Sequence, residues 1–329
     1  MRQFSTLVLD DKTIRKISDI KKSIMAVEDA FYEYGKGRVQ MPAKIYLHLD
    51  KYSGDFRAMP AYIEKLERCA LKWVNVHPSN ARFGLPAVMA LLILSNPKNA
   101  LPLCIMDATY LTAMRTGAAG AVAAKYLARA DSKIVSLVGS GVQARMQLNA
   151  LRCLFKINEV RVWGHKALYI RKFIREMKSS KYQLKAADNI KECVRGSDII
   201  VTTTPSRKPL VKLDWVKPGA HINAIGADGK GKQELCPAVL KQAKLVVDNW
   251  EQASHSGEIN VALRKGQISK KDIYTDIGKI VCGKRRGRIN KNEITVFDST
   301  GLAIQDVAVA DLIYRIAKKK KVGKQINFI

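Results

Sequence analysis

The chain has 329 residues, with 57 lysines and arginines against 29 aspartates and glutamates, and a formal net charge of +28. Its 47% hydrophobic content is enough for one large or two moderate domains with buried cores. No apolar run approaches the ~20 residues of a membrane-spanning helix, and the first residues lack the pattern of a signal peptide. These features favour a cytoplasmic protein.

The positive charge suggests a polyanionic partner such as a nucleic acid. However, basic residues are spread along the whole chain, and the two dense clusters, residues 284–288 and 318–321, contain no aromatic side chains that stack on bases. No specific nucleic-acid partner is therefore expected, and the charge stays unexplained. The six cysteines and five histidines show no metal-binding spacing, so no metal is expected either.

The first part of the chain predicts a strand-rich module. Apolar residues at helical spacing predict an amphipathic helix over residues 12–34. A turn at residues 51–55 separates the first two strands of a hairpin. The predicted strands are residues 43–49, 56–59, 70–76, 88–94 and 102–106.

An alanine-rich helix over residues 107–130 leads into a second module, in which strands and helices alternate. This alternation is typical of a doubly wound parallel sheet. The six predicted strands are residues 134–138, 160–163, 199–203, 221–225, 245–247 and 294–297. Helices are predicted from residue 142 to 155, and over 168–177 and 237–243. A last helix, residues 305–318, is expected to pack back on the first module.

A Gly-x-Gly-x-x-Ala pattern directly follows the strand of residues 134–138: Gly139, Ser140, Gly141, Val142, Gln143 and Ala144. Gly139 allows the tight turn, Gly141 lets a pyrophosphate approach the backbone, and Ala144 lets the helix pack closely on the strand. The N-terminus of that helix offers free N–H groups to phosphates. The strand before, the helix after and the next strand together indicate a site for NAD(H) or NADP(H).

Four cations of the first module are candidates for binding a substrate carboxylate: Lys44, Arg57, Lys72 and Arg115. Strand alternation places Lys72 on the same face as Ala70 and Val74, and a charge on an apolar face needs a partner. A substrate carboxylate is one such partner; alternatively, the lysine reaches the surface. Arg115 can form two parallel hydrogen bonds with a carboxylate, or a salt bridge at the junction of the modules.

Asp228 follows the strand of residues 221–225, at the end where ligands bind in open α/β sheets. It is therefore the candidate proton acceptor, with a simple turn aspartate as the alternative. Thr203, Thr204 and Pro205 end another strand and are candidates for lining the nicotinamide pocket.

Six blocks resemble the ornithine cyclodeaminase/mu-crystallin family, in the same order and over nearly the whole chain. Within that family the chain is most similar to the archaeal-type alanine dehydrogenase branch. The blocks are MPAY (59–62), LKWVNVHPSN (71–80), LTAMRTGAAGAVAAKYLAR (111–129), GSGVQA (139–144), IGADGKGKQEL (225–235) and VFDSTGLAIQDVAVA (296–310).

The resemblance implies a homodimer joined through the sheets of the first module, with a Rossmann domain inserted before the final helix. The expected fold class is therefore α/β. A Rossmann doubly wound dinucleotide-binding domain spans residues 118–303. A strand-rich α+β domain for substrate binding and dimerisation combines residues 1–117 with 304–329.

The resemblance also implies roles for single residues. Lys72 and Arg115 match the family's substrate-carboxylate residues, and Lys44 lies about where a substrate-binding arginine usually stands. Asp228 matches the catalytic aspartate, and Lys72 is expected to share in catalysis by polarising a substrate oxygen. Cofactor contacts are implied at Arg115, Thr116, Asp228, Ser299 and Gly301.

Two positions depart from the pattern of relatives. Arg57 stands where cyclodeaminases carry a glutamate, so a second amine on the substrate would meet a cation, which argues against ornithine cyclisation. His165 and Lys166 stand where NAD-specific sites carry an acid for the ribose 2′-hydroxyl. A cation there can meet a 2′-phosphate, as in the mu-crystallin branch, so NADP(H) or dual use is expected. The alternative is NAD binding through other contacts.

The expected function is that of an NAD(P)-dependent L-alanine dehydrogenase, which reversibly converts a small L-amino acid into its 2-oxo acid and ammonium. Three alternatives stay open: a cyclic ketimine reductase, an ornithine cyclodeaminase, and an NADP(H)-dependent ligand-binding protein with little turnover. The sequence does not rank pyruvate against other small 2-oxo acids.

Overall fold

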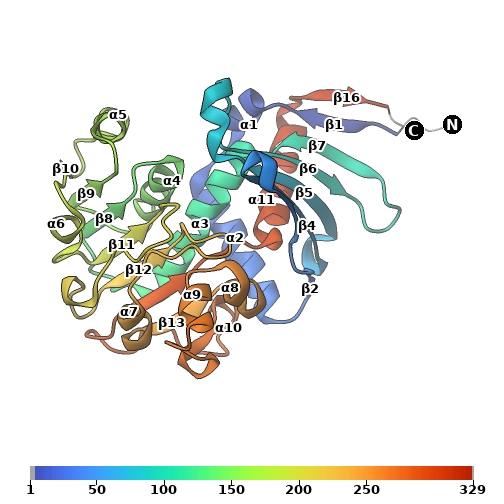
Figure 1. The fold of residues 1–329 in the computed structure, drawn as a ribbon. Coiled ribbons are helices and arrows are strands. Elements are labelled where there is room, and N and C mark those ends of the chain that lie inside the picture. Colours follow the sequence, from blue (N-terminus) through green and yellow to red (C-terminus); the bar gives the residue numbers. More distant parts are fainter. Residues whose placement is uncertain (1–3, 328–329) are drawn as a thin grey trace. The chain divides into compact units, whose positions relative to one another are not determined.

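The structure is a computed structural model that describes residues 4–327 of the chain. The chain divides into two compact units, whose elements are labelled in Figure 1. Unit 1 contains the residues up to Arg115 and those from Leu302 onward, and unit 2 is Thr116–Gly301. The sequence places the corresponding boundaries at residues 117 and 304.

Unit 1 is built on an eight-stranded sheet in the order β16-β1-β7-β6-β5-β4-β2, with β3 paired to β4. All neighbouring strands are antiparallel except β1 and β7. The strands are β1 (Thr6–Leu9), β2 (Val39–Gln40), β3 (Ile45–Leu49), β4 (Gly54–Ile63), β5 (Arg68–Val76), β6 (Val88–Ser95), β7 (Pro102–Asp107) and β16 (Lys324–Ile326).

The two faces of this sheet differ in exposure, as β5 illustrates. Ala70, Lys72 and Val74 are buried, whereas Leu71 and Trp73 between them are exposed. Successive side chains of a strand point to opposite faces, so the alternation predicted for Lys72 is confirmed. The lysine therefore lies on the buried face of the sheet, and an apolar row lies on the exposed face.

Helices α1 (Asp11–Ile17), α2 (Ile20–Gly35) and α11 (Ala303–Lys320) lie entirely in unit 1, and α3 begins there. Helix α11 contacts α2 and strands β4, β5 and β6, which confirms that the final helix packs back on the first module (Figure 1). The single helix predicted over residues 12–34 is wrong. Asp19 begins a second helix there, because its side chain accepts hydrogen bonds from the backbone N–H groups of Lys21 and Lys22.

Unit 2 contains an eight-stranded, fully parallel sheet in the order β10-β9-β8-β11-β12-β15-β13-β14. The α/β fold class with a doubly wound sheet is thus confirmed. The strands are β8 (Ile134–Val138), β9 (Glu159–Trp163), β10 (Gln183–Ala186), β11 (Ile199–Thr202), β12 (His221–Ala224), β13 (Lys244–Val247), β14 (Ile273–Asp276) and β15 (Thr295–Asp298).

The predicted count of six strands in this sheet is too low. The six predicted strands are present, but β10 and β14 were missed. Both lie at the edges of the sheet, and β10 is mostly exposed, so it lacks the continuous apolar run of a buried strand. In unit 1, β1, β2 and β16 were also missed; β2 and β16 have only two and three residues and are not buried.

Strand β8 lies in the interior of this sheet, between β9 and β11. The chain leaves β8 through β9 and β10 and then returns to pair β11 with the other side of β8. The carboxyl ends of β8 and β11 therefore flank the switch point, where ligands bind in sheets of this topology.

The chain passes from unit 1 to unit 2 within helix α3 (Thr109–Leu127), which is buried over most of its length. Helix α4 ends at Leu151, earlier than the predicted residue 155. In residues 4–327, no helix is long and apolar enough to cross a membrane. The other helices of unit 2 are α4 (Val142–Leu151), α5 (Ala167–Met177), α6 (Ile190–Val194), α7 (Pro237–Gln242), α8 (Trp250–Ser256), α9 (Asn260–Arg264) and α10 (Ile277–Val281).

Candidate active site

A cluster of buried charges lies in unit 1, where β5, α3 and α11 meet. The Nζ atom of Lys72 lies 2.8 Å from both carboxylate oxygens of Asp306. The Nε atom of Arg115 donates to Asp306 Oδ1 at 2.9 Å, and its Nη1 donates to Gln305 Oε1 at 2.8 Å. Since all these side chains are buried, one carboxylate here serves two cations.

Burial and this charge imbalance together shift the pKa of Lys72. Burial, followed by the charge of Arg115, lowers the pKa of Lys72 to about 7, although Asp306 favours its cationic form. Lys44 adds a smaller repulsion of the same sign. When Lys72 is protonated, the cluster of Lys72, Arg115 and Asp306 carries one uncompensated positive charge. An anion bound beside it would relieve that repulsion and raise the pKa of Lys72.

Asp306 is the functional candidate that the sequence argument missed. A substrate carboxylate or the solvent was expected to accommodate Lys72, but the structure shows a carboxylate from α11, 234 positions away in sequence. A signal was available. Asp306 lies in the first part of α11, among the apolar residues Ile304, Val307 and Val309, and a buried acid is as costly there as a buried lysine on a strand. The two anomalies explain each other.

Arg57, another predicted substrate cation, differs from Lys72 in charge balance. The register of β4 and β5 pairs Met59 with Lys72 and Arg57 with Val74, so Arg57 points to the same face as Lys72. Arg57 donates from Nε and Nη2 to the two carboxylate oxygens of Asp55, at 2.7 and 3.0 Å. The uncompensated charge therefore lies at Lys72 rather than at Arg57.

The predicted dinucleotide turn has the geometry that phosphate binding requires. Gly139 has a φ of +120°, and a Cβ atom there would lie 2.4 Å from Thr203 Oγ1. At Gly141, which precedes α4, a Cβ atom would meet nothing within 4 Å, so the backbone faces open space. Ala144 is fully buried against the strand. The turn thus fits a diphosphate at the N-terminus of α4.

The first turn of α4 also carries a cation that sequence analysis did not single out. Arg145 Nη1 donates to the carbonyl oxygens of Ser140 and Gly141, and Arg145 Nε donates to Glu176. After β9, His165 packs edge-on against Trp163, and the exposed Lys166 directly precedes α5. The segment 163–167 contains no acid to accept from a ribose 2′-hydroxyl.

The candidate proton acceptor lies in the loop after β12. Asp228 Oδ1 accepts a hydrogen bond from Lys232 Nζ at 2.5 Å, and the side chain is partly exposed. The segment after β11 lies close to this loop, because Thr204 and Gly226 both donate to the carboxylate of Glu234. Strands β11 and β12 are neighbours, so these candidates share one edge of the sheet.

Ser299 and Gly301 follow β15, the next strand of the same sheet. The Oγ atom of Ser299 is buried and has no hydrogen-bond partner among the described residues. The backbone N–H of Gly301 donates to Asp248 at 2.8 Å. Thr116, at the start of unit 2, accepts at its carbonyl oxygen from Gln147 Nε2. The buried hydroxyl of Ser299 is thus an available polar group at this edge.

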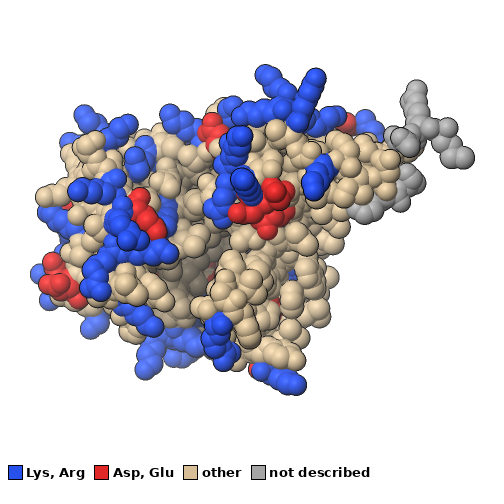
Figure 2. Space-filling view, turned by 90° about the horizontal axis from the view of Figure 1, so that it is seen from above, with Lys and Arg blue, Asp and Glu red and all other residues tan. Residues whose placement is uncertain are grey.

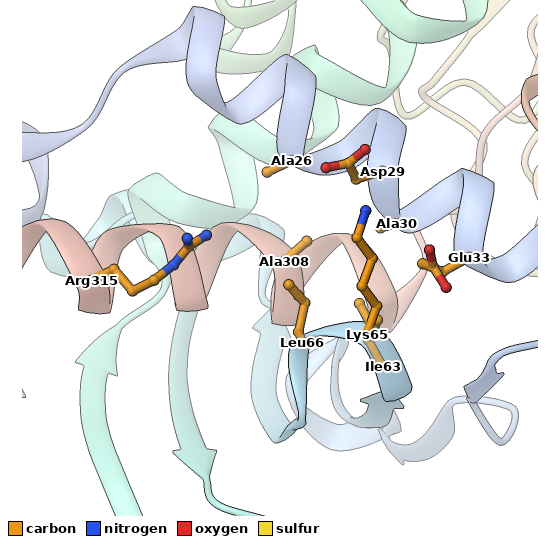
Figure 3. A pocket seen from close by; sticks show the side chains of 9 residues that line it. All are labelled: Ala26, Asp29, Ala30, Glu33, Ile63, Lys65, Leu66, Ala308 and Arg315. Atoms are coloured by element: carbon orange, nitrogen blue, oxygen red, sulfur yellow. The ribbon is translucent and has the colours of Figure 1, made fainter.

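Other features of the described residues lie outside this cluster. Lysines and arginines are scattered over the face shown in Figure 2, with smaller acidic groups between them. A hollow in unit 1 is lined by α2, α11 and the segment after β4, and includes none of the predicted site residues (Figure 3). Among residues 4–327, no group of three or more histidine, cysteine, aspartate or glutamate residues could hold a metal ion.

The chain matches the ornithine cyclodeaminase/mu-crystallin family over residues 5–321. It belongs to this family. An alanine dehydrogenase from Archaeoglobus fulgidus is 50% identical over 98% of each chain. The ketimine reductase mu-crystallin of Rattus norvegicus is 30% identical over 95% of this chain and 98% of its own.

Two solved structures of family members are similar throughout. An archaeal alanine dehydrogenase dimer with bound NAD has 49% identity and a TM-score of 0.95, covering 99% of this chain and 100% of that one. A Δ1-pyrroline-2-carboxylate reductase from Thermococcus litoralis, in complex with NADH and L-proline, has 37% identity and the same TM-score, covering 98% and 100%. The family resemblance predicted from the six sequence blocks is therefore confirmed.

The charge cluster leads to a stability prediction. Asp306→Asn is expected to lower the free energy of unfolding by about 3–5 kcal/mol at about pH 6, because it leaves two buried cations without this carboxylate. Lys72→Met should cost clearly less, since Arg115 and Asp306 then balance each other. Urea denaturation at one fixed protein concentration measures both values. Equal losses in the two variants would contradict the charge balance.

Proposed function

We propose that the protein is an NAD(P)-dependent amino-acid dehydrogenase that interconverts a small L-amino acid, L-alanine first, with its 2-oxo acid and ammonium. The observation that carries the proposal is the uncompensated positive charge of Lys72, Arg115 and Asp306. A buried cation without full compensation is costly, and the carboxylate of an amino acid or 2-oxo acid supplies the missing charge. The similarity to alanine dehydrogenases over the whole chain supports the choice of substrate.

The residues of the chain take distinct roles in this proposal. Lys72 and Arg115 bind the substrate carboxylate and orient the Cα–H bond; Lys44 and Arg57 are the other candidate substrate contacts. A bound nicotinamide supplies the hydride acceptor. Asp228 takes a proton from the substrate ammonium, or from the water that attacks the imine, and Lys72 polarises the oxygen of the resulting carbinolamine. Much of the acceleration comes from positioning.

The cofactor is proposed to be NAD(H) or NADP(H), with both accepted. The glycine turn and the N-terminus of α4 would hold the diphosphate, and Thr203, Thr204, Pro205 and Ser299 would line the nicotinamide pocket. Relatives solved with NAD and NADH support NAD(H). Lys166, together with the lack of an acid after β9, supports the acceptance of a 2′-phosphate as well.

The activity is tested with purified protein, ammonium, and NADH or NADPH in parallel, followed by the absorbance of the reduced nicotinamide. Pyruvate, larger 2-oxo acids and Δ1-pyrroline-2-carboxylate form the substrate panel. With pyruvate and ammonium, oxidation of the reduced cofactor is expected. Oxidation with the cyclic imine alone would indicate a ketimine reductase, and ammonia release from ornithine without net cofactor change would indicate a cyclodeaminase. Binding without turnover would indicate a ligand-binding protein.

Asp228→Asn is expected to lower kcat by ~10²–10⁴, because an amide cannot take the proton. The Kd for NADH should change little, because the amide oxygen of the asparagine can still accept a hydrogen bond at this implied cofactor contact. Asp188→Asn, at an exposed position of unit 2, is the matched control and should keep full turnover. Near-normal turnover of Asp228→Asn would refute the role of Asp228.

Substrate affinity is expected to depend on pH through Lys72. Its pKa of about 7 means that the lysine loses its charge as the pH rises above neutrality, so carboxylate binding should weaken. Calorimetric titration of pyruvate into the protein–NAD⁺ complex, from about pH 6 to about pH 9, measures the effect without turnover. Lys72→Arg should flatten the profile, and Lys72→Met should flatten it at weaker affinity. A flat wild-type profile would contradict the role of Lys72.

We also propose that the protein forms a homodimer through the exposed face of the unit 1 sheet. The register places Trp73 beside Leu91 and Leu71 beside Ile93, so these side chains form one continuous apolar surface. Their exposed fractions, together with those of Ile45 and Leu47, lie between 40% and 61%. A second copy of the chain would bury this surface, as supported by the dimeric alanine dehydrogenase relative.

The double substitution Leu71→Asp/Leu91→Asp is expected to convert the dimer into a monomer, because each copy would place two carboxylates in an apolar interface. Leu168→Asp changes a leucine of unit 2 that is 63% exposed and should leave the dimer intact. Sedimentation velocity measures the oligomeric state of both variants. A dimer that survives the double substitution would place the interface elsewhere.

A further inference from the structure

Three buried carboxylates of unit 2 form a series, in which each accepts hydrogen bonds from the backbone of the segment that carries the next one. Asp298, at the end of β15, accepts from the backbone N–H groups of Glu258 and Ile259, at 2.9 and 3.1 Å. The carboxylate of Glu258 accepts from the backbone N–H groups of Glu234 and Leu235, at 2.8 and 2.6 Å. Each acid thus fixes the segment that carries the next one, and the series ends at Glu234.

Glu234 uses both carboxylate oxygens to join two loops. Its Oε1 accepts from the backbone N–H and the hydroxyl of Thr204, at 2.6 and 2.7 Å. Its Oε2 accepts from the backbone N–H of Gly226, at 2.9 Å. Thr204 belongs to the segment after β11, and Gly226 precedes Asp228 in the loop after β12. This one side chain therefore hydrogen-bonds to both loops.

The geometry leaves little freedom at this connection. A Cβ atom at Gly226 would lie 2.2 Å from the carbonyl oxygen of Thr204 and 2.5 Å from Glu234 Oε2. Burial raises the pKa of Glu234 to about 7, and burial together with the charge of Glu234 raises the pKa of Glu258 well above its ordinary value. Two adjacent buried acids are costly, so what the site gains is two acceptor oxygens in fixed positions.

We propose that Glu234 is a positioning residue for the nicotinamide end of the cofactor site, through the link that it makes between the Thr203–Pro205 segment and the Asp228 loop. The inference rests on the proposed function, because it assumes that these segments line the nicotinamide pocket. Glu234 touches neither cofactor nor substrate in this proposal. It acts through Thr204 and Gly226.

The experiment compares two ligands that share the diphosphate site. ADP-ribose binds the turn of residues 139–144 and lacks the nicotinamide, whereas NADH carries it. In Glu234→Gln, the amide oxygen can still accept from Thr204, but the amide N–H₂ group then faces the N–H of Gly226, donor against donor. Calorimetry should show NADH binding weakened about tenfold, while the Kd of ADP-ribose changes less than about twofold.

A second variant allows the test to be made even if Glu234→Gln does not fold. Gly226→Ala forces the same two loops apart from the opposite side and should reproduce the selective loss of NADH affinity. Glu251→Gln, at an exposed position on α8, should leave both affinities unchanged. Thermal melting verifies that each variant is folded.

The outcomes separate this inference from the proposed function. Equal losses for NADH and ADP-ribose in the folded variants would overturn the positioning role and reduce Glu234 to general structural support. Unchanged affinities for both ligands would overturn it as well. Wild-type protein that binds neither ligand would refute the dinucleotide site itself, and the inference with it.

Discussion

The structure of unit 1 depends on one buried carboxylate, Asp306, which holds Lys72 and Arg115 together. Removing three charged groups from water is expensive, and a single acid repays only part of the cost. Full compensation by a second acid would make the cluster stable but indifferent to anions. No compensation would leave two like charges in contact. Partial compensation keeps the side chains ordered and retains an attraction for one more negative charge. This attraction is what the binding of a small carboxylate requires.

In unit 2, buried acids at the ends of strands are stabilised by backbone N–H groups. The central strands β11, β12 and β15 of its parallel sheet are fully buried, so polar groups are accommodated where strands end and backbone N–H groups become available. Thr204, Gly226 and Gly301 each donate to a buried acid at these ends. The acids are satisfied by N–H donors rather than by cations. Such bonds have defined directions, so the loops after β11, β12 and β15 are held by geometry rather than by charge.

The central strands of the fold were predictable from the sequence because fully buried strands consist of short runs of apolar residues. Strands β11 and β12 are buried along their whole length, β8 is buried in all but its first residue, and all three were recognised. β10 was missed because an edge strand needs no such run. The pairing of Lys72 with Asp306 was missed for another reason: each residue is anomalous in its own element, but only the packing of α11 on β5 brings them together. The glycine turn was predictable because all its parts are contiguous.

The charge of this cluster also fits a feature shared by the substrates and ligands named among the relatives. Alanine, pyrroline-2-carboxylate and proline share a carboxylate on the carbon that bears nitrogen, and this is the group that Lys72 and Arg115 are proposed to bind. The argument from Arg57 against a second amine is weaker than the sequence suggests, because Asp55 compensates that charge within its own strand. Discrimination between a chain and a ring must therefore come from the space around the rest of the substrate. In the proposed function, the buried positive charge selects the class of substrate, and the space around the rest of the substrate selects among the members of that class.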